Sequence, residues 1–474
     1  MKYSILSKER LTADNQDVPL YQKVQDLILE EIKSGTLKPG TLIPSTRELA
    51  ELLGVSRKTT VKAIENLIMK GHLESRDRVG TYVRKKLPEK GDGVSGMPFG
   101  EKKNTEGHSY MLVINDGFPD TRLVPFREFS RAHRQIFNRM AQWMMLCYNP
   151  PVGYGRLRSI VAEILGRLAG LSVDDDDVCV VRGSQMALFL VANAILSPGD
   201  HIAMETPGYD KAYKAFHQAG LNIHGIPVDD EGIDVDRLEA LCKEIEIHAI
   251  YITPRYQYPT TATLSMARRQ KLRDLSLRYR FLVIEDDFGL AYNFNDRHVP
   301  PMSVMLPKSH YIYIGTFSKV FAPGIRLGYL ASSADIVRQI ASYRTLVDIQ
   351  GDIITERAIC ELFDSGHLQK HIRHSLKAYK ERLGEASAAI RDILGDSVTY
   401  RQPRGGLALW LSLKGESITE EALRKYLHAH DIDAPIFTLA TGRVGIRIGY
   451  ASLLPSHLKQ FLERLKVFIV QSQE

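Results

Sequence analysis

Residues 85–109 constrain the fold of this 474-residue chain most, because they separate two parts that have to fold independently. The segment is rich in Gly, Lys and Glu and holds almost no large apolar side chain, so it cannot bury enough surface to fold and predicts a flexible linker. Before it, residues 19–84 show short helical patterns, preceded by an N-terminal extension at residues 1–18. After it, residues 110–474 alternate apolar strands with helices, which indicates an α/β fold.

The composition is that of a globular protein with a sizeable core, with 44% hydrophobic and 25% charged residues. No stretch approaches the roughly 20 apolar residues of a membrane helix, and the N-terminus lacks the pattern of a signal peptide. The four cysteines form no CxxC pair, which is typical of unpaired thiols in a reducing compartment and predicts no metal site. We therefore expect a cytoplasmic protein with no membrane partner.

Residues 19–84 contain helices and a hairpin in the order of a winged helix. Apolar residues at helical spacing over residues 19–35 predict a first helix that ends at a glycine. The second helix starts at Ser45, and Glu48 three residues later predicts a capping box. A tight turn leads to a third helix, which completes a helix-turn-helix, and residues 71–83 alternate like a hairpin with a basic tip.

The same region concentrates positive charge, since residues 19–86 carry +5 of the chain's formal net charge of +6. This distribution indicates a polyanion at that end of the chain, although a helical packing domain with a solvated basic face is an alternative. From "PLYQKV" through "LKPG", "PSTRELAELLGVSR" and "GTYV" the region closely resembles the GntR-type winged helix. We predict contacts with double-stranded DNA from the second and third helices and the wing, at Ser45, Arg47, Ser56, Arg57, Lys58, Thr59, Thr60, Lys62, Arg78, Gly80 and Thr81.

In the second part of the chain, Lys319 lies in a run of small and hydroxyl residues, "GTFSKVFAPGIRLGYL". Its amine can form an imine with a phosphorylated aldehyde, and Thr316, Ser318 and Arg326 can bind the phosphate. A second anion site is predicted at Ser184, where an apolar helix follows a buried strand. On its own, that motif is explained as simply by a helix cap.

Three more side chains are candidates for a ligand site. Adjacent carboxylates end a buried strand in the run Ile284-Glu-Asp-Asp-Phe288, where one of them can pair with a protonated pyridine nitrogen, or the run is a solvated acidic loop. Tyr209 can stack on a ring or serve only in packing. Arg447 lies between apolar strand residues, so its guanidinium needs a ligand carboxylate or an internal salt bridge.

Together and in this order, these motifs make the chain from about residue 110 to the C-terminus similar to the fold-type I aminotransferases. The resemblance implies pyridoxal 5′-phosphate (PLP), a large domain with a mixed, mostly parallel sheet at about 150–345, and a small α+β domain at about 346–474. It implies that Lys319 would form the internal aldimine, a Schiff base, and that Arg447 would take the substrate α-carboxylate. The other cofactor contacts that it implies are Asp286 at the pyridine nitrogen, Tyr209 on the ring, and Ser184, Gln185, Thr316, Ser318 and Arg326 at the phosphate.

Two positions depart from the aminotransferase pattern. Phe288 stands where those enzymes have a tyrosine that donates to the coenzyme 3′-oxygen, and Tyr258 stands where they have an asparagine before a proline. Tyr258 or Tyr256 can supply the missing hydroxyl, and we count Tyr258 among the cofactor-binding residues. Because a lost donor changes the imine pKa, we expect poor transamination with retained aldimine formation.

A GntR-type winged helix fused to such a body resembles the MocR/GabR family of transcriptional regulators. The resemblance implies a homodimer with swapped domains that binds PLP and responds, through the aldimine at Lys319, to PLP itself or to a small amino compound. We expect an effector sensor rather than an enzyme. Two alternatives are a working aminotransferase with an accessory DNA-binding module, and a regulator whose body has lost PLP and serves only dimerisation.

Overall fold

The computed structural model divides the chain into two compact units, residues 1–97 and 98–474. It describes residues 19–69, 72–76, 80–84, 111–139, 147–294, 299–415 and 417–472. The predicted N-terminal extension and linker, and Arg78 in the predicted wing, lie outside these ranges. None of the helices in the described ranges is both long enough and apolar enough to cross a membrane.

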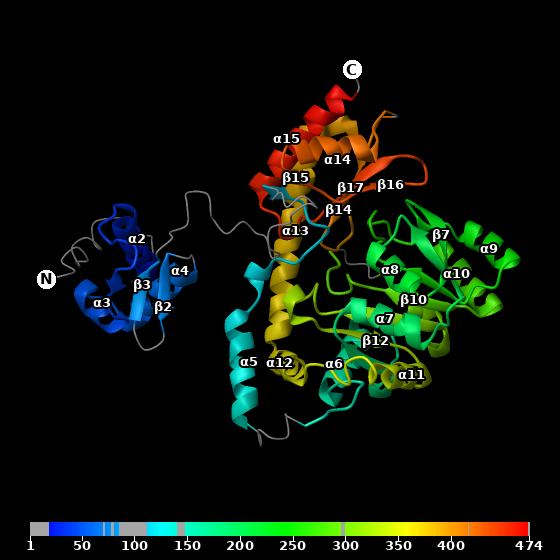
Figure 1. Cartoon of the computed structure of the whole chain (residues 1–474), viewed down its shortest axis with the longest axis horizontal. Helices are drawn as coiled ribbons and strands as arrows, with labels where there is room; N and C mark the ends of the chain where they lie inside the picture. Colours follow the sequence, from blue (N-terminus) through cyan, green and yellow to red (C-terminus); the bar gives the residue numbers. More distant parts are fainter. Residues whose placement is uncertain are drawn as a thin grey trace. The chain divides into compact units, whose positions relative to one another are not determined.

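The N-terminal unit is a winged helix, drawn in blue in Figure 1. Three helices pack with a small antiparallel sheet of strand order β1-β3-β2. Its core is formed by apolar side chains of all three helices and of the sheet, including Val24, Leu49, Leu67 and Val83. The bounds are α2 (Leu20–Lys33), β1 (Leu42–Ile43), α3 (Thr46–Leu53), α4 (Arg57–Met69), β2 (Leu73–Arg76) and β3 (Gly80–Val83).

The helix-turn-helix forms for the local reasons that the sequence indicated. Ser45 Oγ accepts a hydrogen bond from the Glu48 amide at 3.3 Å, and the Glu48 carboxylate accepts one from the Ser45 amide at 2.8 Å, so the predicted capping box is confirmed. Gly54 ends α3 in the left-handed conformation with φ 62°, which a glycine adopts without a steric penalty. The turn between α3 and α4 therefore stays tight.

The second unit is built on an eight-stranded sheet with the order β5-β12-β11-β10-β9-β6-β7-β8. β12 runs antiparallel to both of its neighbours, and β8 runs antiparallel to β7. All other adjacent strands are parallel, so the sheet is mixed and mostly parallel, as predicted. The strands are β5 (Val178–Val181), β6 (His201–Thr206), β7 (Asn222–Asp229), β8 (Gly232–Ile233), β9 (Ala249–Ile252), β10 (Leu282–Asp286), β11 (Tyr311–Thr316) and β12 (Gly328–Ala331).

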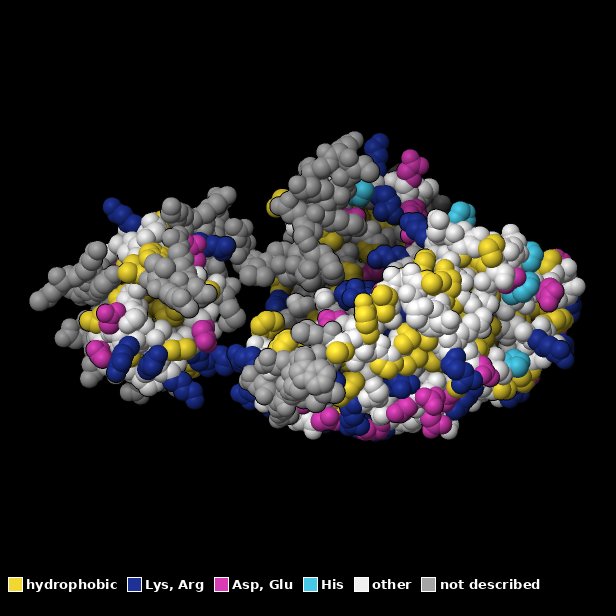
Figure 2. Space-filling view, turned by 60° about the horizontal axis from the view of Figure 1, so that its bottom comes forward, with side chains coloured by type: hydrophobic (Ala, Val, Ile, Leu, Met, Phe, Trp, Pro, Cys, Tyr) yellow, Lys and Arg dark blue, Asp and Glu magenta, His cyan; other side chains and the backbone are white. Residues whose placement is uncertain are grey.

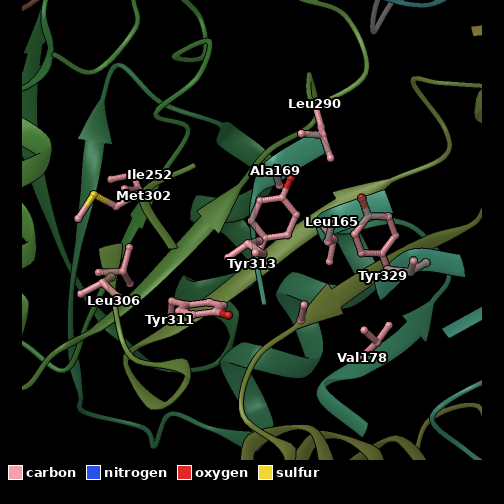
Figure 3. Close-up of a cluster of buried hydrophobic side chains, with 14 of the residues drawn as sticks. Leu165, Ala169, Val178, Ile252, Leu290, Met302, Leu306, Tyr311, Tyr313 and Tyr329 are labelled. Carbon is pink, nitrogen blue, oxygen red and sulfur yellow. The ribbon is translucent and has the colours of Figure 1, made fainter. Parts of the chain in front are cut away.

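Helices cover both faces of this sheet, because alternate strand residues point to opposite sides. Val178, Tyr311 and Tyr313 join one buried cluster with α6, α9, α10 and α12, and Figure 3 shows these three side chains within it. Cys179 and Ile312 join a second cluster with α7, α8 and α11 on the other face. The helices are α6 (Gly155–Ile164), α7 (Ser184–Ala194), α8 (Asp210–Gln218), α9 (Val235–Glu244), α10 (Met266–Tyr279), α11 (Ala334–Arg344) and α12 (Ile353–Asp364), with α5 (Phe126–Arg139) against α12.

A smaller α+β domain follows, and its C-terminal part is drawn from orange to red in Figure 1. Its antiparallel sheet has the order β13-β14-β17-β16, and its core also takes in the long helix α13 and the helices α14 and α15. A separate two-stranded sheet pairs β4 with β15. The bounds are β4 (Leu112–Val113), α13 (His367–Leu394), β13 (Val398–Tyr400), β14 (Leu409–Leu413), α14 (Glu420–Ala429), β15 (Ile432–Asp433), β16 (Ile436–Thr438), β17 (Val444–Ile448) and α15 (Pro455–Gln471).

The large and the small domain are not separated by one cut in the sequence. Leu112 and Ile114 belong to the core of the small domain because β4 pairs with β15, whereas the sequence division began that domain near residue 346. Conversely, Ile359 on α12 packs in the core under the large sheet. These two differences arise because contacts between distant segments, which no local pattern encodes, decide which core each element joins.

Candidate functional site

A cavity of about 710 Å³ opens where the carboxyl ends of the parallel strands meet. This is the edge of an open α/β sheet where ligands bind as a rule. The structure brings all ten ligand-site residues predicted from the sequence to its wall, although they come from seven separate stretches of the chain: Ser184, Gln185, Tyr209, Tyr258, Asp286, Thr316, Ser318, Lys319, Arg326 and Arg447.

Lys319 lies three residues after the end of β11 and is held in place by a short segment near the start of the unit. Its Nζ donates a hydrogen bond to the carbonyl oxygen of Gly117 at 2.8 Å and lies 4.5 Å from the ring centroid of Phe118. Burial lowers the pKa of the amine, and the nearby Asp116 carboxylate opposes this effect. A lowered pKa increases the neutral fraction of the amine, which is the form that attacks a carbonyl carbon.

Asp286, the last residue of β10, is a buried carboxylate with one oxygen that accepts no hydrogen bond from the described residues. Tyr251 donates to its Oδ2 at 3.0 Å, whereas Oδ1 has no hydrogen-bond partner among the described residues. Burial raises the pKa of this carboxyl to about 7, while the Tyr251 hydrogen bond partly opposes the rise. Its neighbour Asp287 is, by contrast, engaged by Arg255 and Tyr313 at 2.9 Å. Asp286 is therefore suited to receive a cation or an N–H donor from a ligand.

The end of the cavity near α7 is built to bind an anion. Ser184 is the first residue of that helix, and the buried Ser318 Oγ has no partner among the described residues. Arg326 reaches the same place, where its Nη2 donates to the Arg182 carbonyl at 3.0 Å. A side chain at Gly183 would place its Cβ only 2.8 Å from that Nη2, so the glycine leaves room for the guanidinium. Free amides at a helix N-terminus beside an arginine suit a phosphate.

Arg447 lies in the middle of β17 and is 97% buried, with 3% of its surface exposed. Its Nε and Nη1 donate to the carbonyl oxygens of Asp116 and Pro259 at 2.7 and 2.8 Å. Within the described residues no carboxylate lies at ion-pair distance, so the internal salt bridge considered from the sequence is not seen. Burial lowers the pKa of the guanidinium. A ligand carboxylate would supply the missing counter-charge.

Two aromatic residues complete the wall beside Arg447. Tyr258 stacks its ring 4.9 Å from the guanidinium and meets the ring of Tyr209 edge-on at 5.3 Å. Phe288 also lines the cavity, whereas the hydroxyl of Tyr256 is bonded to the buried Tyr292 carbonyl at 3.0 Å. Of the two tyrosines that could replace the missing hydroxyl, only Tyr258 reaches the cavity.

Asp116 and Tyr251 are among the residues of this wall that the sequence did not predict. Tyr251 lies inside the apolar run of β9, where it was read only as a strand residue. Asp116 lies some 200 residues before Lys319, and the sequence signal beside it is the run Gly-Phe-Pro-Asp at residues 117–120, which resembles an active-site approach segment of the aminotransferases. Their roles depend on strand ends that meet in space.

Comparison with known proteins agrees with this geometry. Residues 118–465 match the family "Aminotransferase class I and II". The chain belongs to the aminotransferase class I and II family. Residues 20–83 of this aminotransferase-family chain match "Bacterial regulatory proteins, gntR family", so the N-terminal unit is a GntR-type winged helix, as predicted.

Relatives of this chain include a regulator that matches nearly its whole length and aminotransferases that match about three quarters of it. The probable rhizopine catabolism regulatory protein MocR of Rhizobium meliloti is 26% identical over 95% of this chain and 94% of its own length. Aromatic-amino-acid aminotransferase 1 of Thermococcus litoralis is 28% identical over 72% of this chain and 83% of its own. Among solved structures, the multiple substrate aminotransferase of Thermococcus profundus has a TM-score of 0.71 at 25% identity, over 77% of this chain and 93% of that one. The α-aminoadipate aminotransferase LysN of Thermus thermophilus, complexed with N-(5′-phosphopyridoxyl)-L-leucine, has a TM-score of 0.68 at 26% identity, over 76% and 92%.

The cofactor of this family member is PLP, and the cavity fits it. Four buried polar atoms on the wall have no partner within the described residues: Asp116 Oδ1, Asp286 Oδ1, Ser318 Oγ and Gln185 Oε1. A cationic ring nitrogen would donate to Asp286 Oδ1, and a phosphate would accept from the Ser318 hydroxyl. When bound, PLP supplies an electron sink, and the residues that would hold it are Lys319, Asp286 and the anion-binding end of the cavity.

The winged helix of the fusion presents most of the predicted DNA-binding residues to solvent. In Figure 2, Lys and Arg side chains gather on the lower part of this unit. Thr59 and Thr81 are half-buried, and the exposed residues are Ser45, Arg47, Ser56, Arg57, Lys58, Lys62 and Gly80. Lys62 also lies 3.8 Å from the ring centroid of Tyr21.

Thr60 is the exception, and for this residue the prediction of a DNA contact is wrong. Its side chain is completely buried, and its Oγ1 donates to the carbonyl oxygens of Thr46 at 2.8 Å and Arg57 at 3.0 Å. Thr60 thus ties α4 to the start of α3 inside the domain. It follows basic residues in the sequence, but the helical turn points it inward.

Proposed function

We propose that this chain is a PLP-binding transcriptional regulator, which binds double-stranded DNA through its winged helix and senses PLP or a small amino compound at Lys319. The observation that carries the proposal is the union of both parts in one chain. The MocR relative matches 95% of the chain, so the likeness extends over the winged helix and the body together. A DNA partner also locates its action in the cytoplasm.

Three side chains would divide the recognition of an effector between them. Lys319 would take the aldehyde of PLP or give it up to an effector amine, Asp286 would hold the ring nitrogen, and Arg447 would take an effector carboxylate. All three line one cavity and come from different elements. A ligand that binds them together would favour one arrangement of those elements. It would change DNA affinity only through its different affinity for the two arrangements of the protein.

We extend the proposal to a homodimer with swapped domains. Large apolar side chains are exposed around α5 and the loop after α11, with 73% of Phe126, 84% of Tyr148 and 80% of Leu346 accessible. A second cavity of about 630 Å³ in this region shares Gly324 and Arg326 with the main one. Exposed apolar surface of this kind favours association. A second copy would cover this surface and close the open side of the coenzyme site.

The test begins with double-stranded DNA fragments selected by the protein from a random pool. Fluorescence anisotropy then measures the affinity for these fragments with and without PLP and amino compounds, for wild type and Lys319→Ala. We expect Lys319→Ala to bind DNA without ligand as wild type does and to lose the ligand response and the visible absorbance of bound PLP. Lys211→Ala, which removes an exposed lysine from the same cavity, should keep both. An unchanged ligand response in Lys319→Ala would refute the sensor.

The alternative is an aminotransferase that carries an accessory DNA-binding unit. The presence of Lys319, Asp286 and Arg447 in one cavity favours it, and so does the identity of 28% with an aromatic-amino-acid aminotransferase. Phe288 argues against an aminotransferase, because the site lacks at that position the tyrosine hydroxyl that donates to the coenzyme 3′-oxygen in those enzymes. Turnover of an amino donor with a keto acid at about 1 per second or faster, the range of ordinary enzymes, would decide for the enzyme.

A further inference from the structure

Asp116 is a carboxylate on the cavity wall that neither the coenzyme roles nor the DNA roles account for. Its Oδ2 accepts a hydrogen bond from the hydroxyl of Tyr258 at 3.3 Å. Its Oδ1 is shielded from solvent and has no hydrogen-bond partner among the described residues. Because a buried acceptor without a donor is unfavourable, such an atom in a ligand cavity indicates a donor that arrives with the ligand.

The backbone around Asp116 also holds the two cations of the site. The carbonyl oxygen of Asp116 accepts from Arg447 Nε at 2.7 Å, and that of Gly117 accepts from Lys319 Nζ at 2.8 Å. Phe118, the next residue, places its ring under the same amine. A ligand that reaches from Lys319 to Arg447 therefore runs along this segment and passes beside the Asp116 carboxylate.

We propose that Asp116 is a specificity residue that receives a second cationic group of the effector, so that the effector is an amino acid with an additional amine. The inference rests on the proposed function, in which Lys319 and Arg447 take the first amine and the carboxylate of the effector. The additional ammonium donates to Oδ1 and balances its charge. A neutral effector leaves that oxygen without a donor, and an acidic one adds a second negative charge beside it.

Two other roles for the charges in this cavity fit the structure less well. Asp116 could serve only as the counter-ion of Lys319, but no ion pair joins these two within the described residues, and Nζ donates to a backbone carbonyl instead. Lys211, which also lines the cavity, could attract an acidic effector, but its side chain is exposed. Solvent and salt screen an exposed charge far more than a shielded one, so Asp116 dominates the selection.

The test compares amino acids that differ at the end of one four-carbon side chain. L-Lysine ends in an amine, L-norleucine has no end group, and L-2-aminoadipate ends in a carboxylate; L-ornithine and L-2,4-diaminobutyrate place the amine closer. Isothermal titration calorimetry with the PLP-loaded full-length protein measures each affinity. We expect the best diamino acid to bind at least about tenfold more tightly than norleucine, as one charge-assisted hydrogen bond provides. In Asp116→Asn the ratio falls to within about threefold while norleucine still binds.

Asp210→Asn is the matched control, because Asp210 lines the same cavity but is exposed and paired with Lys214 at 2.6 Å. It should keep the preference for the diamino acid. A wild-type protein that prefers norleucine or aminoadipate overturns the inference without any variant, and so does a preference that survives in Asp116→Asn. If PLP attaches to Lys319 but the preference is absent, only this inference fails; if PLP does not attach, the proposed function fails with it.

Discussion

Replacing Asp286 by asparagine tests whether burial of this carboxylate prepares the site for a cationic ring. In the coenzyme-free protein burial raises the pKa of Asp286 to about 7, whereas an unfolded chain holds an aspartate near its ordinary value of 3.8. Well below pH 3.8 the carboxyl is protonated in both states, and the folded state loses nothing. As the pH rises from 4 to 7, the unfolded chain releases the proton and the folded chain keeps it, so the stability falls.

The loss of stability is complete above pH 7. The difference between the two pKa values, 3.8 and about 7, corresponds to a loss of about 4 kcal/mol of unfolding free energy. Asparagine has the same shape, keeps the Tyr251 hydrogen bond and does not ionise. We therefore expect coenzyme-free Asp286→Asn to be more stable than wild type, with a difference that grows by about 3 kcal/mol between pH 5 and pH 8. Titrating groups that do not interact with Asp286 cancel in the comparison because both proteins contain them.

The assay is urea unfolding of both proteins without coenzyme at pH 5, 6, 7 and 8, followed by circular dichroism. A second measurement, the affinity for PLP at pH 8, should show a loss of at least about tenfold in Asp286→Asn, since a buried pyridinium would lose its ionic partner. A difference in stability that is the same at pH 5 and pH 8 would refute the reasoning about burial. Unchanged affinity for PLP would refute the assignment of Asp286 to the ring nitrogen.

Three further substitutions test the local arguments. Ser45→Ala removes the capping box with Glu48 and should lower the unfolding free energy of the winged helix by about 1 kcal/mol, measured by thermal denaturation; no loss would mean that the box is not stabilising. Gly328→Ala places a Cβ 2.7 Å from the Gly183 backbone, so we expect a loss of about 1–3 kcal/mol in stability and weaker PLP binding, and full PLP affinity would contradict it. Phe288→Tyr should lower by about one unit the pH at which the absorbance of bound PLP titrates, because the added hydroxyl would stabilise the coenzyme phenolate. An unchanged titration would show that position 288 does not face that oxygen.

The sequence by itself determined the features that neighbouring residues encode. The runs that were read as strands around Val178, Ala249, Leu282 and Tyr311 are strands in the structure, and the capping box forms at Ser45. These predictions succeeded because strand alternation, helix caps and glycine turns depend on residues a few positions apart. The family was also readable, because its motifs are short and occur in a fixed order.

Only the tertiary structure decided which side chains meet and what surrounds them. Arg447 lies on a strand of the small domain, yet it lines the same cavity as Lys319, which follows a strand of the large sheet. The burial that turns Thr60 inward, raises the pKa of Asp286 and leaves Asp116 Oδ1 without a donor comes from elements far away in the chain. Solvation and partners are properties of packed elements, whereas a local pattern specifies only the element to which a residue belongs.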